Sequence, residues 1–171
     1  MVVARFDTDA LRHNVAFIRE RAPNSRLMAV VKANAYGHGM LAAARAMDAD
    51  AFAVARVDEG IRLREAGELR PILVLEGCQQ PSEMSLASRH ELQVVVHTTR
   101  QAGWFGEGFP VEAWLKVETG MHRLGLDVGT FRRLATAPPV GMRVAGLMSH
   151  LGFANEAGDP RTEVQLAVFD D

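Results

Sequence analysis

Six short apolar runs recur along this sequence, and a segment with helical character separates each run from the next. The runs are almost continuously apolar, which is typical of strands covered on both faces of a parallel sheet. Helices that alternate with such strands predict either a doubly wound sheet or a (β/α)8 barrel. The expected strands are RLMAVVKA, DAFAVA, PILVLEG, LQVVVH, VEAWLKVE and MRVAGLMSHL, at residues 26–33, 50–55, 71–77, 92–97, 111–118 and 142–151.

The segments between these strands carry helix start and stop signals. Asp7-Thr8-Asp9 can cap the first helix, and Pro23 with Asn24 ends it. Gly67 stands where a helix would stop, and Thr98 or Thr99 would begin another. The expected helices cover residues 10–22, 38–49, 57–67, 82–91, 98–105, 129–137 and 161–171.

The length limits which of these folds the chain can complete. A closed barrel has eight strands and typically about 250 residues, whereas this sequence has 171 residues and six expected strands. We therefore expect an α/β chain that is an incomplete (β/α)8 barrel, forming one truncated domain over residues 1–171.

The bulk composition excludes several classes of function. The net charge is −2, with acidic and basic residues mixed, so no basic stripe indicates nucleic-acid binding. No apolar run approaches the length of a membrane span. The N-terminus lacks the pattern of an export signal, and the single cysteine, Cys78, excludes an internal disulfide. We expect a soluble cytoplasmic protein in which Cys78 is inert or surface-exposed.

Three positions follow expected strands and would lie on the functional face of a barrel, where the strands end. Lys32 ends the first strand, Arg123 lies in a glycine-bracketed loop, and His150 ends the last strand. Lys32 could extend its ammonium to solvent, or it could form a Schiff base. Arg123 suits bidentate recognition of a carboxylate or a phenolate, although a surface arginine would have the same sequence pattern. His150 could be a packed residue or a site residue.

The loop after Lys32, ANAYGHG, carries further candidates. Tyr36 could direct its hydroxyl at a ligand, and Gly37 and Gly39 could let the backbone approach a phosphate. His38 fits a loop or cap residue better than a metal ligand, because no second ligand stands at a useful spacing. We therefore expect no metal site.

Lys116 poses a separate problem, because it lies inside a strand pattern. An unpartnered ammonium would be costly there. Lys116 could be exposed, or it could pair with Glu118 or with an acidic residue of a neighbouring strand.

Three segments, VVKANAYGHG, KVETGMHRLG and LMSHLGFANE, together resemble the alanine racemase family of pyridoxal-phosphate enzymes. The resemblance extends over essentially the whole chain and includes ALRHN and AVARVDEGIRLREAG. It implies that Lys32 forms the covalent imine with pyridoxal 5'-phosphate and acts as a base at the α-carbon on the D-alanine face. Tyr36 would bind the cofactor phosphate, Arg123 the cofactor's phenolic oxygen and the substrate carboxylate, and His150 would lie beside the ring.

The resemblance also implies features outside these four residues. Lys116 matches a lysine that is carbamylated in many relatives, a change that turns a buried cation into an anion able to hold Arg123. The family interconverts L-alanine and D-alanine as a homodimer, and a tyrosine from the partner subunit's C-terminal domain supplies the second proton-transfer group.

The chain departs from the family pattern chiefly in length, since relatives are about twice as long. It lacks the last two barrel strands, the β-rich C-terminal domain, the arginine that pairs with the pyridine nitrogen, and the second tyrosine. A local departure is Leu151-Gly152, where many relatives carry Phe-Ala. We therefore expect an inactive fragment of a racemase. The alternatives are a non-catalytic pyridoxal-phosphate-binding barrel, a barrel decarboxylase or lyase with the same cofactor, and an inert partial barrel.

Overall fold

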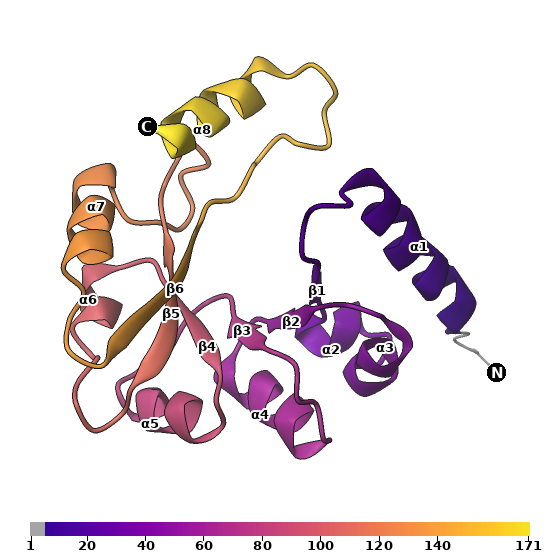
Figure 1. Ribbon diagram of the computed structural model, residues 1–171, viewed down its shortest axis with the longest axis horizontal. Helices are drawn as coiled ribbons and strands as arrows, with labels where there is room; N and C mark the ends of the chain where they lie inside the picture. The colour runs from indigo at the N-terminus through magenta and orange to yellow at the C-terminus, as the bar shows by residue number, and fades with distance from the viewer. Residues whose placement is uncertain (1–5) are drawn as a thin grey trace. The chain divides into compact units, whose positions relative to one another are not determined.

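The computed structural model describes residues 6–171, and the chain divides into two compact units with a boundary between Leu75 and Glu76. Each unit is built from strands that alternate with helices along the chain (Figure 1). No helix among the described residues is both long enough and apolar enough to cross a membrane.

The first unit contains three parallel strands in the order β1-β2-β3. Val30 of β1 lies opposite Ala53 of β2, and Val54 lies opposite Val74 of β3. The elements of this unit are α1 (Thr8–Arg21), β1 (Met28–Val30), α2 (Lys32–Tyr36), α3 (Met40–Ala46), β2 (Ala51–Val54), α4 (Val57–Glu65) and β3 (Ile72–Val74).

The second unit contains three further parallel strands in the order β4-β5-β6. Val96 of β4 lies opposite Leu115 of β5, and Lys116 lies opposite Met148 of β6. The elements of this unit are α5 (Ser82–Arg89), β4 (Gln93–Val96), α6 (Thr99–Ala102), β5 (Val111–Lys116), α7 (Val128–Thr136), β6 (Met142–Met148) and α8 (Pro160–Asp170).

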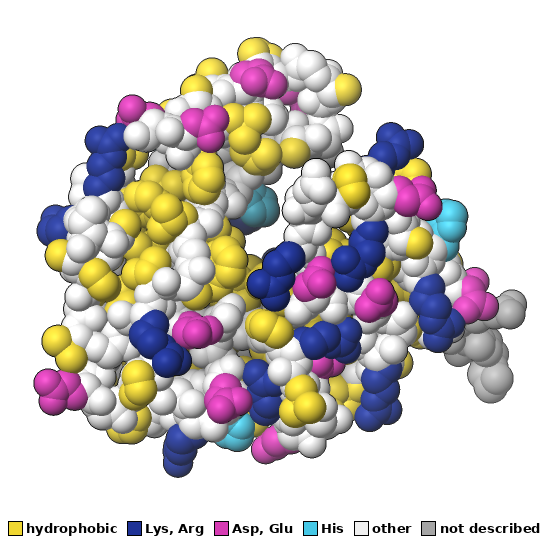
Figure 2. Space-filling view, viewed as in Figure 1, with side chains coloured by type: hydrophobic (Ala, Val, Ile, Leu, Met, Phe, Trp, Pro, Cys, Tyr) yellow, Lys and Arg dark blue, Asp and Glu magenta, His cyan; other side chains and the backbone are white. Residues whose placement is uncertain are grey.

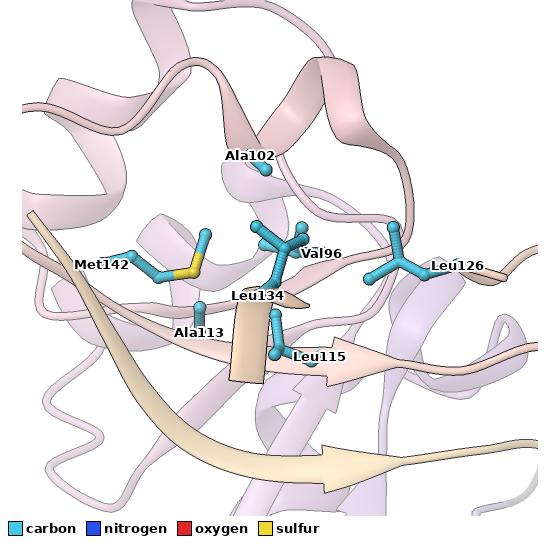
Figure 3. Packing of buried hydrophobic residues seen from close by; sticks show 7 residues of the cluster. All are labelled: Val96, Ala102, Ala113, Leu115, Leu126, Leu134 and Met142. Carbon is cyan, nitrogen blue, oxygen red and sulfur yellow. The ribbon is translucent and has the colours of Figure 1, made fainter. Parts of the chain in front are cut away.

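Strands β2, β3, β4 and β5 are largely buried, which agrees with their apolar sequences, whereas β1 and β6 are only partly buried. In the first unit all four residues of β2 and all three of β3 are buried. In the second unit Val96, Ala113 and Leu115 of β4 and β5 pack against Leu134 of α7 (Figure 3). This arrangement confirms the predicted α/β class with parallel strands.

The predicted helix signals act as expected at three ends. The Asp7 carboxylate accepts hydrogen bonds from the backbone N–H groups of Asp9 and Ala10, both at 3.0 Å. Thr98 caps α6 by accepting a bond from Gln101 N at 3.1 Å. Gly67 follows α4 with a φ of +88°, which glycine adopts readily.

The last strand of the second unit leaves apolar surface exposed. Within the described residues β6 pairs on one side only, with β5. Leu147 of β6 is 46% exposed, and Leu166, Val168 and Phe169 of α8 are also exposed. Figure 2 shows apolar side chains gathered over α7, β6 and α8. An open strand edge beside such a surface favours association with further protein segments.

Candidate functional site

The segment after β1 departs from the predicted strand over residues 26–33, because β1 ends at Val30. The Val31 N–H continues the parallel ladder by donating to Ala53 O at 2.8 Å, and Lys32 then opens a turn. Residues 33–36 all have left-handed backbone angles, with φ between +50° and +55°. Lys32 therefore lies directly beyond the carboxyl end of β1, with a half-buried side chain.

Hydrogen bonds close this left-handed turn at both ends. Ala35 N donates to Val31 O at 2.8 Å, and Gly37 N donates to Ala33 O at 3.0 Å. The Asn34 side-chain oxygen accepts a bond from Met40 N at 3.0 Å, which ties the turn to the start of α3. Left-handed angles cost an L-residue roughly 1–2 kcal/mol each, so the surrounding structure has to impose them.

The turn places the candidate side chains at its two ends. Lys32 begins it, and Tyr36 ends it with a side chain that is 61% exposed and open to a ligand. Gly37, with a φ of +89°, lets the chain leave the turn. His38 follows in the loop, where its Nδ1 lies 2.9 Å from Ala35 O. Residues 6–171 contain no group of three His, Cys, Asp or Glu side chains arranged to hold a metal ion.

Lys116 is the last residue of β5 in the second unit. Its relative exposure is 7%, so the alternative of an exposed side chain is wrong. The backbone carbonyl of Lys116 accepts a bond from Leu126 N at 2.8 Å, and Glu118 N donates to Leu126 O at 2.9 Å. These bonds join the two ends of the loop at residues 119–125.

The Glu118 carboxylate organises this loop, which carries Arg123. Burial by itself raises the pKa of Glu118, but backbone N–H donors from His122, Gly120 and Met121 outweigh it and hold the pKa below its ordinary value. The bond from Gly120 N is 2.6 Å long. A Cβ at Gly125 would lie 2.6 Å from Glu118 N, so the loop closes only with glycine at that position.

Arg123 is exposed and lines an open pocket of about 180 Å³ at the ends of β4 and β5. Glu118 lines the same pocket. The remaining lining residues are His97, Thr98, His122, Leu124 and Gly125. Sequence reasoning missed His97 and Thr98 as neighbours of Arg123, although the expected strand ended at His97.

His150 is exposed and lies two residues beyond β6, whereas the sequence predicted that it would end the strand. Its backbone carbonyl accepts a hydrogen bond at 2.9 Å from Gln165 Nε2 of α8. Gln165 is only 2% exposed and also bonds Thr119. Sequence reasoning missed both residues. The available signal was an amide side chain within the otherwise apolar helical run VQLAVF.

Cys78 is buried, with 2% relative exposure, so the surface-exposed alternative is wrong. Burial, assisted by the charge of Glu83, raises the pKa of the thiol to about 12. A thiol of that pKa is almost entirely protonated near neutral pH, which agrees with an inert cysteine.

Comparisons with known proteins give a consistent assignment. The model of the alanine racemase N-terminal domain matches residues 6–171. The chain is 47% identical to the alanine racemase of Thioalkalivibrio sulfidiphilus, over 98% of this chain and 49% of the relative. It is 44% identical to the alanine racemase of Edwardsiella ictaluri, over 98% and 48%. The chain thus spans about half the length of these curated relatives.

Solved structures agree with this assignment. The biosynthetic alanine racemase from Pseudomonas aeruginosa superposes with a TM-score of 0.87 at 42% identity, covering 95% of this chain and 48% of that one. The alanine racemase from D-cycloserine-producing Streptomyces lavendulae gives 0.85 at 31% identity, covering 100% and 49%. These matches confirm the predicted fold class, an α/β barrel that is incomplete in this chain. The chain belongs to the alanine racemase family, and it corresponds to the N-terminal domain of that family.

Proposed function

We propose that this chain is the cofactor-binding part of a pyridoxal-phosphate-dependent alanine racemase that interconverts L-alanine and D-alanine. The observation that carries the proposal is the position of Lys32. It stands directly beyond β1, at the start of a left-handed turn, in a chain that aligns with alanine racemases over 98% of its length. These 171 residues alone are expected to be inactive, because they span only about half the length of the racemases that they match.

The candidate residues fit pyridoxal 5'-phosphate by their chemistry. The Lys32 amine can condense with an aldehyde, and the exposed Tyr36 hydroxyl can donate a hydrogen bond to a phosphate. The Arg123 guanidinium can bind a phenolate or a carboxylate, and the His150 imidazole can pack beside an aromatic ring.

The reaction requires a proton to leave one face of the α-carbon and return on the other. Pyridoxal phosphate, when bound, supplies a conjugated ring that accepts the electron pair left at that carbon. In our proposal the Lys32 amine takes or returns the proton on the D-alanine face, while Arg123 holds the substrate carboxylate. A tyrosine from the C-terminal domain of a partner subunit acts on the other face, so the active protein is a homodimer.

We propose that Lys116 is carbamylated. The burial of Lys116 at the end of β5 supports this, because the loop that carries Arg123 begins shortly after it. A carbamate is an anion, and it could hold the Arg123 guanidinium by charge-assisted hydrogen bonds. Mass spectrometry of the intact protein would detect the added carboxyl group, and Lys116→Ala would remove it.

We also expect the protein to be cytoplasmic.

The test of this function begins with the full-length protein and pyridoxal phosphate. We expect a visible absorption band and, after borohydride reduction, a cofactor-modified peptide that contains Lys32. Lys32→Ala should lose both signals, whereas Lys116→Ala should retain the covalent label. The full-length protein should also form D-alanine from L-alanine. A covalent label at Lys32 without racemisation would favour a non-catalytic cofactor-binding barrel, and the absence of both would refute the proposal.

A further inference from the structure

Gln165 is the most buried polar side chain of the second unit, and each polar group of its amide has a partner. Its Nε2 donates to Thr119 Oγ1 at 3.1 Å and to His150 O at 2.9 Å. Its Oε1 accepts a bond from Gly152 N at 2.8 Å. One side chain of α8 therefore holds the segment after β5 and the segment after β6 at the same time.

The hydrogen bonds continue beyond Thr119 in one direction. Thr119, which is 4% exposed, lies with its Oγ1 2.7 Å from Ser149 Oγ. Ser149 Oγ lies 3.2 Å from Val117 O, which can only accept. The Ser149 proton thus goes to Val117 O, Thr119 donates to Ser149, and Thr119 accepts from Gln165. Donors and acceptors match along the whole chain of bonds, so the network is fully satisfied.

The network of Gln165, Thr119 and Ser149 does not line the pocket beside Arg123. The segment after β5 carries Arg123 four residues beyond Thr119, and the segment after β6 carries His150. Gln165 bonds the backbone of His150 and the side chain of Thr119, and it is closed off from solvent. It can therefore act on a ligand only through the residues that it holds.

We propose that Gln165 is a positioning residue that fixes the Arg123 loop and His150 relative to each other for cofactor binding. The proposal rests on the proposed function for the roles of Arg123 and His150. Its structural part, the coupling of the two segments through one amide, stands without that function. The two parts can be tested separately.

The structural part is tested by hydrogen exchange on the cofactor-free, full-length protein. Gln165→Met keeps the length of the side chain but removes its hydrogen bonds, so amides in residues 119–125 and 150–153 should lose about tenfold in protection. Glu163→Gln changes an exposed residue of the same helix and should leave them unchanged. Gln101→Met removes another buried amide, which bonds His97 N and the carbonyls of Glu76 and Cys78. It should loosen those segments instead.

Gln165→Glu provides a variant whose defect depends on pH. The protonated carboxyl can still donate one hydrogen bond to His150 O. The ionised carboxylate has no proton to donate, so two acceptor oxygens would face each other there. Protection of residues 150–153, corrected for intrinsic exchange, should therefore fall as the pH rises through the titration of the introduced carboxyl group, whereas Gln165→Met should show no such dependence. Equal protection in wild type, Gln165→Met and Gln165→Glu would overturn the inference.

The functional part is tested by the affinity for pyridoxal phosphate, followed through its visible band. Gln165→Met should bind the cofactor about tenfold more weakly than wild type, and Gln101→Met should show a smaller loss of affinity. Borohydride should still label Lys32 in both variants. Loosened segments with unchanged cofactor affinity would overturn the positioning role. If the wild type itself binds no cofactor, the proposed function fails, and the exchange experiment still decides the coupling.

Discussion

Replacing Ala33 by glycine should stabilise this protein, because Ala33 has a φ of +50° and a ψ of +47°. An L-residue in this left-handed region is disfavoured by roughly 1–2 kcal/mol, a cost that glycine avoids. Glycine loses more backbone entropy on folding than alanine, by roughly 0.5–1 kcal/mol. Ala33 is exposed, so the lost methyl group removes little packing. The difference is a gain of roughly 0–1.5 kcal/mol for Ala33→Gly.

The same substitution at Ala42 is the matched control. Ala42 is also exposed, but it lies in the regular helix α3, where glycine costs about 1 kcal/mol. Asn34→Gly is a second control, because it removes the side-chain bond to Met40 N and should cancel the gain. The two alanine substitutions should therefore change stability in opposite directions.

The assay is urea denaturation of the cofactor-free protein followed by circular dichroism, comparing each variant with wild type. Ala33→Gly should raise the midpoint and Ala42→Gly should lower it. If Ala33→Gly lowered the midpoint as much as Ala42→Gly does, residues 33–36 would be an ordinary right-handed turn, and our account of this segment would be wrong.

The second unit offers three other tests. Gly125→Ala should destabilise this unit by about 2 kcal/mol or more in thermal denaturation, because the new Cβ would clash with the Glu118 backbone. Gly108→Ala is the control and should be nearly neutral, because a Cβ at Gly108 would meet no atom within 4 Å. Glu118→Gln should reduce the acid sensitivity of the unfolding free energy. The native carboxyl has a lowered pKa, so its stabilisation is present above the ordinary value of about 4.5 and is lost as the pH falls through the native pKa. A urea midpoint that falls equally in both proteins on acidification would contradict this. Cys78 should resist alkylation in the native protein and react on unfolding, and rapid labelling of the folded protein would refute its burial.

Within the described residues, the alternation of apolar runs and helices was sufficient to predict the six strands and every helix between them except α2. Local chemistry determines these elements, as at the Asp7 cap and the Gly67 stop. The same reasoning placed Lys32 and His150 at strand ends, and the structure has both just beyond β1 and β6. Lys116 was expected inside a strand, and it is instead the last residue of β5. The roles of these three residues toward a cofactor came from the family resemblance and remain proposals.

Other features depend on long-range contacts and could not be predicted. The β-branched pair Val30-Val31 favours a strand, and nothing in Ala33 or Ala35 indicates left-handed angles, because alanine prefers the right-handed helix. Gln165 acquires its importance only when α8 folds back beside residues 119 and 150, 46 and 15 positions away along the chain. Sequence periodicity carries no information on such pairings.

The left-handed turn also has a consequence for the chirality of the chain itself. Angles near φ +50° are those that D-amino acids prefer, because reversing the configuration at the α-carbon inverts the steric map. A semisynthetic protein with D-alanine at position 33 would therefore keep the backbone path and lose the steric penalty. It would also avoid the added freedom of glycine in the unfolded state. This segment of an alanine racemase family member would thus accept the mirror-image form of alanine in its own backbone more readily than the L-form encoded there.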